Sequence, residues 1–276
     1  MPGRCRPGLA VASCSPYLPV MNADQEIAAC ASLVQRGDSD RFLATMAAPP
    51  AARPALFILY AANLEIARAP WVTQEPMLAQ MRLQFWRDAI HDPASPRAHE
   101  IAAPLARLIS EKALPPELFE RLITAREADL ARTPFKDEAA LWAYLEGTAG
   151  SLMALALRAL GAENDDAARD CGAAQGMANY LLALRVLEAR GRLPLPDGRP
   201  DAIAALAQTG LSRLARARAA GKTLPKTARP ALLAAWRAGS LLRQAARHPG
   251  RVAQGALGQS EFARRFTLLR ASLVGP

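Results

Sequence analysis

The stretch RPALFILYAANLEIARAPW, residues 53–71, has the composition of a helix within a larger helical fold. Tyr60, Asn63, Ala67 and Trp71 follow one another at spacings of three and four residues, so on a helix they share one face. A helix that only packs would carry Leu or Ile there, whereas this face carries a phenol, an amide and a methyl group. The pattern therefore indicates a helix that lines a pocket.

The rest of the chain has the same helical character. Ala, Leu, Arg and Glu dominate, and no segment shows the alternating Val, Ile and Thr of strands. Gly and Pro clusters divide the chain into about nine or ten predicted helices. The longest are expected over residues 74–91, 117–132, 138–160 and 165–189. Because internal repeats and Gly/Ser linkers are absent from the sequence, we predict one all-α domain over residues 22–276.

The first residues, 1–21, carry Arg4 and Arg6 before a short apolar run, as a secretory signal would. That run is too short, and prolines interrupt the segment. We therefore expect a disordered N-terminal extension. No run approaches the roughly 20 unbroken apolar residues of a membrane span, which favours a soluble or peripheral protein. The four cysteines form no CxxC pair, and this favours a reducing, cytoplasmic setting.

The positive charge is concentrated in the last quarter of the chain. Residues 202–276 contain thirteen Lys or Arg and one acid, Glu261, whereas the other 201 residues contain twenty-one basic and twenty-four acidic residues. Such a region favours an anionic membrane surface, nucleic acid or an acidic protein partner, and the alternative is a solvated Arg-rich surface. No aromatic platform or known binding motif accompanies the charge, so we expect no nucleic-acid binding.

Several kinds of catalytic site lack their sequence signals. His91, His99 and His248 are scattered, which argues against a His-centred site. No nucleophile elbow, P-loop or GxGxxG motif occurs.

A second helix, GAAQGMANYLLALRVLEARGRLPLP at residues 172–196, also has an unusual face. Small residues and one amide share it: Gly172, Gly176, Asn179, Ala183 and Leu187. One interpretation is close packing between helices. The other is the wall of a cavity in which Asn63 and Asn179 are polar contacts, because an amide on an apolar face needs a partner.

Five segments, in this order, resemble the squalene/phytoene synthase family of head-to-head prenyltransferases over most of the length from Asp38. They are SDRFLATMAAPPAARPALFILYA, LITAREADL, LWAYLEGTAGSLM, GAAQGMAN and RGRLPLP. The resemblance implies a single-domain, isoprenoid-synthase-like helical bundle with a central cavity. It also implies pocket-lining or ligand-binding residues at Arg53, Tyr60, Asn63, Ala67, Trp71, Asp129, Gly172, Gly176, Asn179, Ala183, Arg190 and Arg192.

The chain departs from that family at its metal ligands. The family's Asp-Asp-x-x-Asp run corresponds here to Ala67, Arg68 and Trp71, and its Asp-x-x-x-Asp run to Ala183 and Leu187. Magnesium needs oxygen ligands, and in this chemistry it activates a diphosphate leaving group. The nearby acids, Glu65 and Glu188, lie about 200° and about 100° away around their helices. We therefore expect no metal ligands, no catalytic residues and no cofactor.

Three segments, YAANLEIARAPW, MRLQFWRDAI and YLEGTAGSL, resemble the branch of this family that contains a mitochondrial complex I assembly factor. The resemblance implies a non-catalytic protein that assists respiratory-complex assembly at a membrane, binds an isoprenoid or lipid, or does both. The expected partners are an anionic membrane surface and a subunit of a respiratory complex. We expect a cytoplasmic location, with a peripheral position on the inner membrane left open. The alternative is an active head-to-head prenyltransferase of isoprenoid biosynthesis, which would need Mg²⁺.

Overall fold

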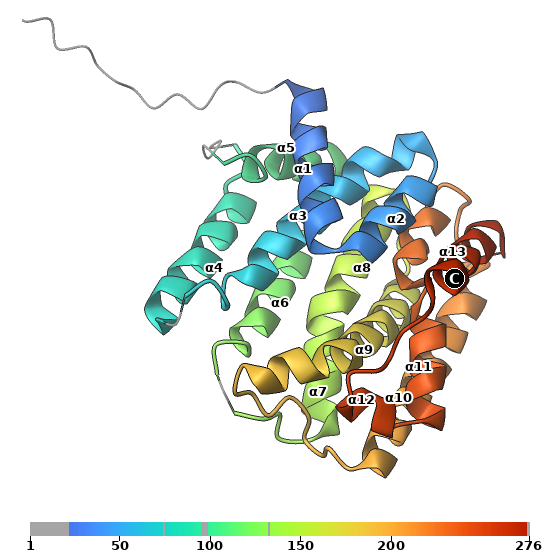
Figure 1. Ribbon diagram of the computed structural model, residues 1–276. Helices are drawn as coiled ribbons and strands as arrows, with labels where there is room; N and C mark the ends of the chain where they lie inside the picture. The colour runs from blue at the N-terminus through green and yellow to red at the C-terminus, as the bar shows by residue number, and fades with distance from the viewer. Residues whose placement is uncertain (1–21, 74, 95–98, 132, 275–276) are drawn as a thin grey trace, which may run out of the picture.

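Helix α3 (Arg53–Arg68) lies in the core of the computed structural model, where it packs against α1, α5 and α8 (Figure 1). Pro54 in its first turn fits a helix start, since proline there gives up no hydrogen bond. Pro70 follows two residues after the last helical residue and prevents continuation. The predicted helix over residues 53–71 is therefore too long, and Trp71 lies in the turn after it.

The structure describes residues 22–73, 75–94, 99–131 and 133–274, and within these ranges it contains helices and no strand. The predicted all-α fold in one helical domain is confirmed. The predicted disordered extension, residues 1–21, lies outside the described residues.

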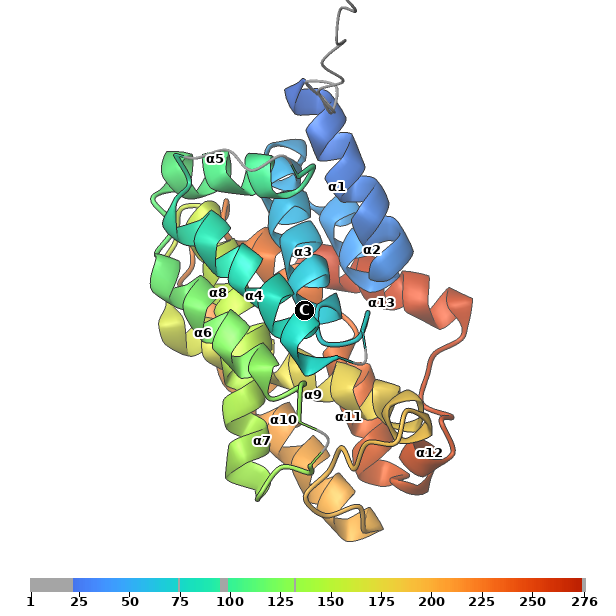
Figure 2. The same cartoon turned by 90° about the vertical axis from the view of Figure 1, so that its left-hand side faces the viewer.

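The N-terminal half surrounds α3 with other helices. Asn22 begins the first of them with a capping box, in which its side chain and that of Gln25 bond each other's backbone N–H. Figure 2 shows the side of the molecule on which α4 and α6 lie. Arg87 of α4 joins them by pairing with Glu120 at 2.7 Å and Glu127 at 2.8 Å. The elements are α1 (Ala23–Gly37), α2 (Ser39–Ala47), η1 (Pro50–Ala52), α4 (Pro76–His91), α5 (Ala102–Lys112) and α6 (Pro116–Glu127).

A continuous helical segment over residues 138–159 includes one irregular turn. Helix α7 (Glu138–Leu145) passes into the π-helix η2 (Glu146–Gly150) and then into α8 (Ser151–Ala159). By length and composition alone this segment could cross a membrane, which the sequence analysis did not anticipate. In the fold, 83% of its most apolar window is buried, so those side chains face other helices.

Helix α9 (Asp165–Ala189) crosses the centre of the bundle and packs against η2, α8, α10 and α11. The predicted helices over residues 74–91, 138–160 and 165–189 agree with the structure to within two residues at each end. The described residues contain thirteen α-helices, more than the nine or ten expected, because short helices occur beside the long ones.

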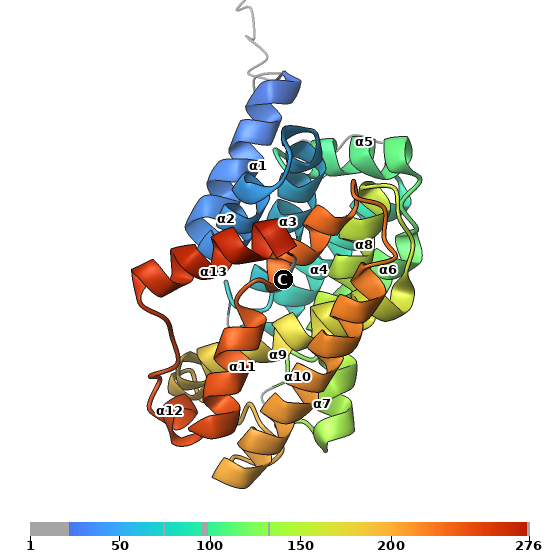
Figure 3. The ribbon, with the colours of Figure 1, turned by 90° about the vertical axis from the view of Figure 1, so that its right-hand side faces the viewer.

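The C-terminal region forms the side of the molecule that faces the viewer in Figure 3. There α13 lies across the outside of the bundle and contacts α2 and η3. The elements are α10 (Pro200–Gly221), η3 (Arg229–Ala235), α11 (Ala238–Arg247), α12 (Gly250–Ala253) and α13 (Glu261–Val274).

Candidate functional site

A cavity of about 550 Å³ opens where the C-terminal ends of α3 and α9 meet α7 and η2. The loop after α6 and residues 190–194 after α9 complete its walls. This volume lies within the usual range of small-molecule pockets.

A buried carboxylate, that of Asp129, forms one corner of the cavity. The Tyr144 hydroxyl donates to it at 3.0 Å and Arg126 donates at 3.2 Å. Arg126 also donates to the Tyr144 hydroxyl at 2.6 Å. Arg192 approaches from the other side and donates to the backbone carbonyls of Asp129 and Ala131. Two guanidinium groups and a phenol therefore compensate the buried charge.

The local electrostatics keep the two phenols at this corner neutral. Burial raises the pKa of Tyr144, Arg126 opposes that rise, and Asp129 adds to it. Burial also raises the pKa of Tyr180, Asp129 adds to the rise, and Arg192 opposes it. Burial disfavours the charge of Arg126, but Tyr144 and Asp129 outweigh that effect and raise its pKa. At neutral pH both phenols stay protonated as hydrogen-bond donors.

Trp71 connects the end of α3 to the segment after α9. Its ring lies 4.3 Å from the Arg192 guanidinium carbon and 5.3 Å from that of Arg190, both within cation–π range. The Tyr180 hydroxyl donates to the carbonyl of Pro194 at 2.7 Å and holds the same segment. The Arg-Gly-Arg sequence is thus fixed at the cavity by an indole ring and a phenol.

Arg41 of α2 reaches the cavity from its inner side. It pairs with Asp38 at 2.7 Å, donates to Gln175 at 3.2 Å, and lies 5.4 Å from the Tyr60 ring. Tyr60 therefore lies behind Arg41, and burial raises the pKa of its phenol.

Residues 34–198, more than half of the chain, match the squalene/phytoene synthase family. The chain belongs to that family.

A relative from Drosophila melanogaster, NADH dehydrogenase (ubiquinone) complex I, assembly factor 6 homolog, is 35% identical over 166 residues, which cover 56% of this chain and 49% of the relative. The chain spans about half the length of the curated relatives it matches.

Two solved structures have a similar fold. A squalene synthase from Alicyclobacillus acidocaldarius has a TM-score of 0.68 and 18% identity, covering 84% of this chain and 95% of that one. A dehydrosqualene synthase in complex with ligand has a TM-score of 0.73 and 15% identity, covering 91% of this chain and 96% of that one.

The magnesium of the squalene/phytoene synthase family does not fit the residues of this cavity. Ala67, Trp71, Ala183 and Leu187, at the aspartate positions, all line it and supply no oxygen ligand from their side chains. Of the described lining residues, only Asp129 is acidic, and it already accepts the hydrogen bonds given above. Across the ranges that the structure describes, no group of three or more His, Cys, Asp or Glu could hold a metal ion.

The structure brings most of the predicted site residues together. Eight of the twelve line the cavity: Ala67, Trp71, Asp129, Gly176, Asn179, Ala183, Arg190 and Arg192. Asn179 is exposed there, so it does not need the buried partner expected for an amide on an apolar face.

The other four predicted residues lie outside the lining. Arg53 donates to the Ala48 carbonyl and lines a different cavity, beside α10 and η3. Tyr60 lies behind Arg41, and Asn63 is buried within the packing of α3. Gly172 is covered by η2, so the packing interpretation holds at that end of its face, whereas the cavity interpretation holds from Gly176 onward.

Sequence reasoning missed Arg126, Tyr144 and Tyr180 as parts of this site. Arg126 lies three residues before Asp129, the spacing of one helical turn, which was a usable signal. Tyr144 lies within the family-like segment LWAYLEGTAGSLM. Nothing in the local pattern indicated Tyr180, because its partner Pro194 lies beyond the end of the helix.

Proposed function

We propose that this protein assists the assembly of respiratory complex I as a non-catalytic member of its family, with a cavity that binds an isoprenoid or lipid without metal. The main support is that Ala67, Trp71, Ala183 and Leu187 line the cavity at the positions where the family has its metal-binding aspartates. The same observation argues against turnover of prenyl diphosphates, since the leaving group would lack the cation that activates it.

The cavity wall has the chemistry to hold an anionic amphiphile. Among the described residues, its charged lining comprises one acid, Asp129, and five bases: Arg41, Arg126, Lys136, Arg190 and Arg192. Apolar side chains such as Leu145, Ala183 and Leu187 also line it. Guanidinium groups bind phosphate oxygens through paired N–H donors, so the head group needs no metal ion.

The link to complex I is supported by the curated relatives, whose printed names are those of complex I assembly factors. We propose a cytoplasmic protein that works at the inner membrane, because the basic C-terminal quarter attracts an anionic surface. Its partners there would be the bilayer and a subunit of the complex.

The first prediction concerns the reaction. Purified protein incubated with farnesyl diphosphate and magnesium should release no pyrophosphate, with an active squalene synthase as the positive control. The same ligand should bind equally well with and without EDTA in calorimetry, because arginines rather than a metal hold its head group. Steady turnover at even roughly 0.01 per second, far below usual enzyme rates, would instead support the active prenyltransferase.

The role in assembly is tested separately. Deletion of the gene should lower NADH:ubiquinone oxidoreductase activity and the amount of assembled complex I, with succinate dehydrogenase as the control. Re-expression of the full chain should restore both. An unchanged level of complex I after deletion would contradict the assembly role, whatever the cavity binds.

A further inference from the structure

Helix α13 carries a row of exposed apolar side chains on its outer face. Phe262, Phe266, Leu269 and Leu273 have exposed fractions of 82%, 60%, 57% and 76%. Their spacings of four, three and four residues place them within an arc of about 60° on the helix. We call these four residues the α13 stripe.

The opposite face of α13 packs against the body of the protein, so the α13 stripe faces outward. Ala271 is buried, and Leu268 packs with it against a small cluster that includes Ala44, Leu233 and Trp236. Because another face of α13 already packs against the core, the α13 stripe is not needed for packing within the fold. Figure 3 shows α13 on the surface.

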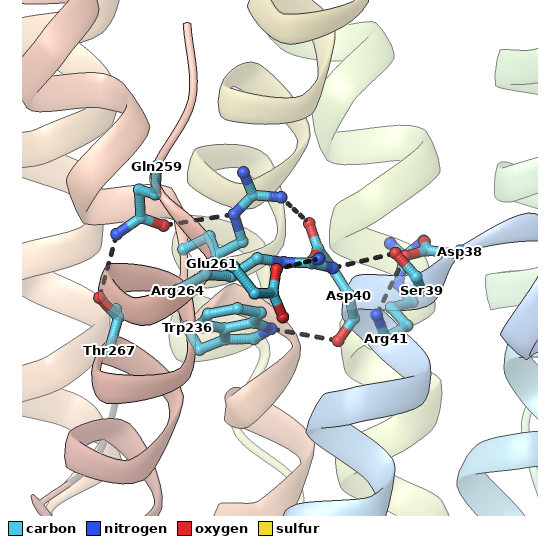
Figure 4. Close-up of polar contacts among 10 residues, drawn as sticks. Asp38, Ser39, Asp40, Arg41, Trp236, Gln259, Glu261, Arg264 and Thr267 are labelled. Atoms are coloured by element: carbon cyan, nitrogen blue, oxygen red, sulfur yellow. Dashed lines mark hydrogen bonds and ion pairs between the residues drawn. The ribbon is translucent and has the colours of Figure 1, made fainter.

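A polar network fixes this orientation (Figure 4). The carboxylate of Asp40 on α2 pairs with Arg264 and Arg237, and the Trp236 indole N–H donates to the Asp40 carbonyl at 3.1 Å. The side chain of Gln259 donates to Thr267 at 3.0 Å. Arg264 is thus held against the body of the protein, whereas the side chain of Arg265 is 79% exposed.

Two exposed arginines border the α13 stripe. Arg265 and Arg270 each lie about 40° beyond one edge of it. Arg265 pairs with Glu261 at 3.1 Å, but both side chains are largely exposed, so the pair is weak and leaves the arginine available. An apolar arc with a cation on each side is the arrangement of a helix that lies in a membrane interface.

The surroundings of α13 add further positive charge. Arg218 of α10 lies near Arg243 of α11 and Arg270, and its pKa is lowered first by burial and then by these two cations. Residues Ala271 to Leu273 also form one wall of a cavity of about 890 Å³. Among the described residues of that cavity, the charged ones are all basic: Arg53, Arg218, Lys222, Lys226 and Arg229.

We propose that α13 docks this protein onto an anionic phospholipid bilayer, with the α13 stripe in the interface and Arg265 and Arg270 at the lipid phosphates. This inference rests on the proposed position at the inner membrane and names the surface that makes the contact. A second copy of the chain fits the stripe less well. Two stripes brought together would set the flanking arginines of both copies against one another, and like charges in contact repel.

The test is flotation of the full chain with phosphatidylcholine vesicles, prepared with and without phosphatidylglycerol. We expect binding that needs phosphatidylglycerol and weakens as salt rises, since screening shortens the range of the attraction. The double variant Phe262→Ser/Phe266→Ser should bind at least about tenfold more weakly, because the stripe loses its two largest apolar groups. Arg265→Gln/Arg270→Gln should lose about fivefold per charge at low salt.

The matched control is Met77→Ser/Met81→Ser, which removes two apolar side chains of α4 that are 71% and 62% exposed. It should bind vesicles as the unchanged protein does. Equal loss in the α4 variant, or no vesicle binding by the unchanged protein, would overturn the proposal. So would concentration-dependent dimerisation that Phe262→Ser/Phe266→Ser abolishes, since a second copy would then cover the stripe. The assembly role would survive these outcomes, because complex I activity after gene deletion is measured independently.

Discussion

At the scale of single residues, the corner formed by Asp129 depends on one hydroxyl group. The Tyr144 phenol donates to the carboxylate and accepts from Arg126, so it links the two charges. Without it, Asp129 keeps Arg126 and Arg192 as its compensating cations but loses its shortest hydrogen bond. A buried carboxylate with an unmet acceptor lowers stability.

We therefore expect Tyr144→Phe to lower the free energy of unfolding by about 1–3 kcal/mol in urea denaturation at neutral pH. Tyr180→Phe is the matched control, since it removes a phenol whose hydrogen bond goes to the neutral Pro194 carbonyl, and it should cost about 0.5–1.5 kcal/mol. Equal stability of Tyr144→Phe and the unchanged protein would show that the hydroxyl is not needed to compensate Asp129.

The same phenol gives the protein a dependence on alkaline pH. In the unfolded chain Tyr144 ionises near its ordinary pKa of 10.0, whereas in the fold its pKa is raised, chiefly by burial. The unfolded state therefore releases the proton first, so stability is complete below about pH 10 and falls as the pH rises further. Unfolding midpoints measured across this range should fall less steeply for Tyr144→Phe. An identical slope in both proteins would contradict the assignment.

Sequence spacing predicted which residues line the cavity together only where those residues lie on the same helix. Ala67 of α3 lines the cavity, as do Gly176, Asn179 and Ala183 of α9. The interaction of Trp71 with Arg190 and Arg192 joins segments far apart in the chain, and a sequence pattern does not encode that geometry. Arg53 and Asn63 lie outside this lining, because sharing a helix, or a face of it, does not determine which neighbour covers a residue.

At the scale of elements, the contact between η2 and α9 depends on the absence of one side chain. A Cβ atom at Gly172 would lie 2.3 Å from the backbone oxygen of Ala149. Backbone atoms cannot move aside as a flexible side chain does, so the two helices would have to separate. Because η2 and α9 both line the candidate cavity, its shape depends on this contact.

Gly172→Ala should therefore destabilise the protein by about 3 kcal/mol, the upper part of the range for an overpacked core. The control is Gly250→Ala in α12, where an added Cβ meets nothing within 4 Å. That change should be neutral or stabilise by up to about 1 kcal/mol, since it restricts the unfolded chain. Comparable loss of stability in both variants, measured by thermal unfolding, would argue against the close contact as the cause.

The start of α9 agrees with the sequence pattern because Asn164 caps it, whereas the helix predicted over residues 53–71 continued past Pro70 and was too long. The helix predicted over residues 117–132 ends earlier, at Glu127. In the segment after it, Arg192 donates to the carbonyls of Asp129 and Ala131, a long-range contact that the local pattern does not show. The π-turn at η2 likewise has no signal in the local pattern, because it depends on packing against α9.

At the scale of the whole molecule, Asp40 joins an N-terminal helix, α2, to the C-terminal region of the chain. Its carboxylate binds Arg237 and Arg264, which follow it by nearly two hundred residues or more, and so attaches α13 to α2 (Figure 4). The excess of basic residues in the last quarter is visible in the sequence. The sequence did not predict that Arg264 would be used internally while Arg265 and Arg270 stay exposed.

Asp40→Asn should loosen α13 before the rest of the fold, because two half-buried arginines lose their shared counter-ion. We expect a loss of about 2–3 kcal/mol in overall stability and faster amide exchange confined to α13 and its contacts. Asp201→Asn, at an exposed residue in the first turn of α10, is the control and should leave exchange in α13 unchanged. Uniformly faster exchange across the bundle would show that Asp40 supports the core rather than the attachment of one helix.

The position of Trp71 beside two arginines determines how a metal site could be introduced into this cavity. An aspartate restored at residue 71 alone would lie beside Arg190 and Arg192 and form ion pairs with them, so its oxygens would be engaged before any divalent cation arrived. Aspartates at residues 67, 183 and 187 would be needed as well, and each alone would add uncompensated negative charge without assembling a binding site. No single one of these substitutions would supply the set of oxygen ligands that magnesium needs. A metal site at this cavity therefore requires several coordinated substitutions, whereas a change in the size or polarity of its lining requires only one.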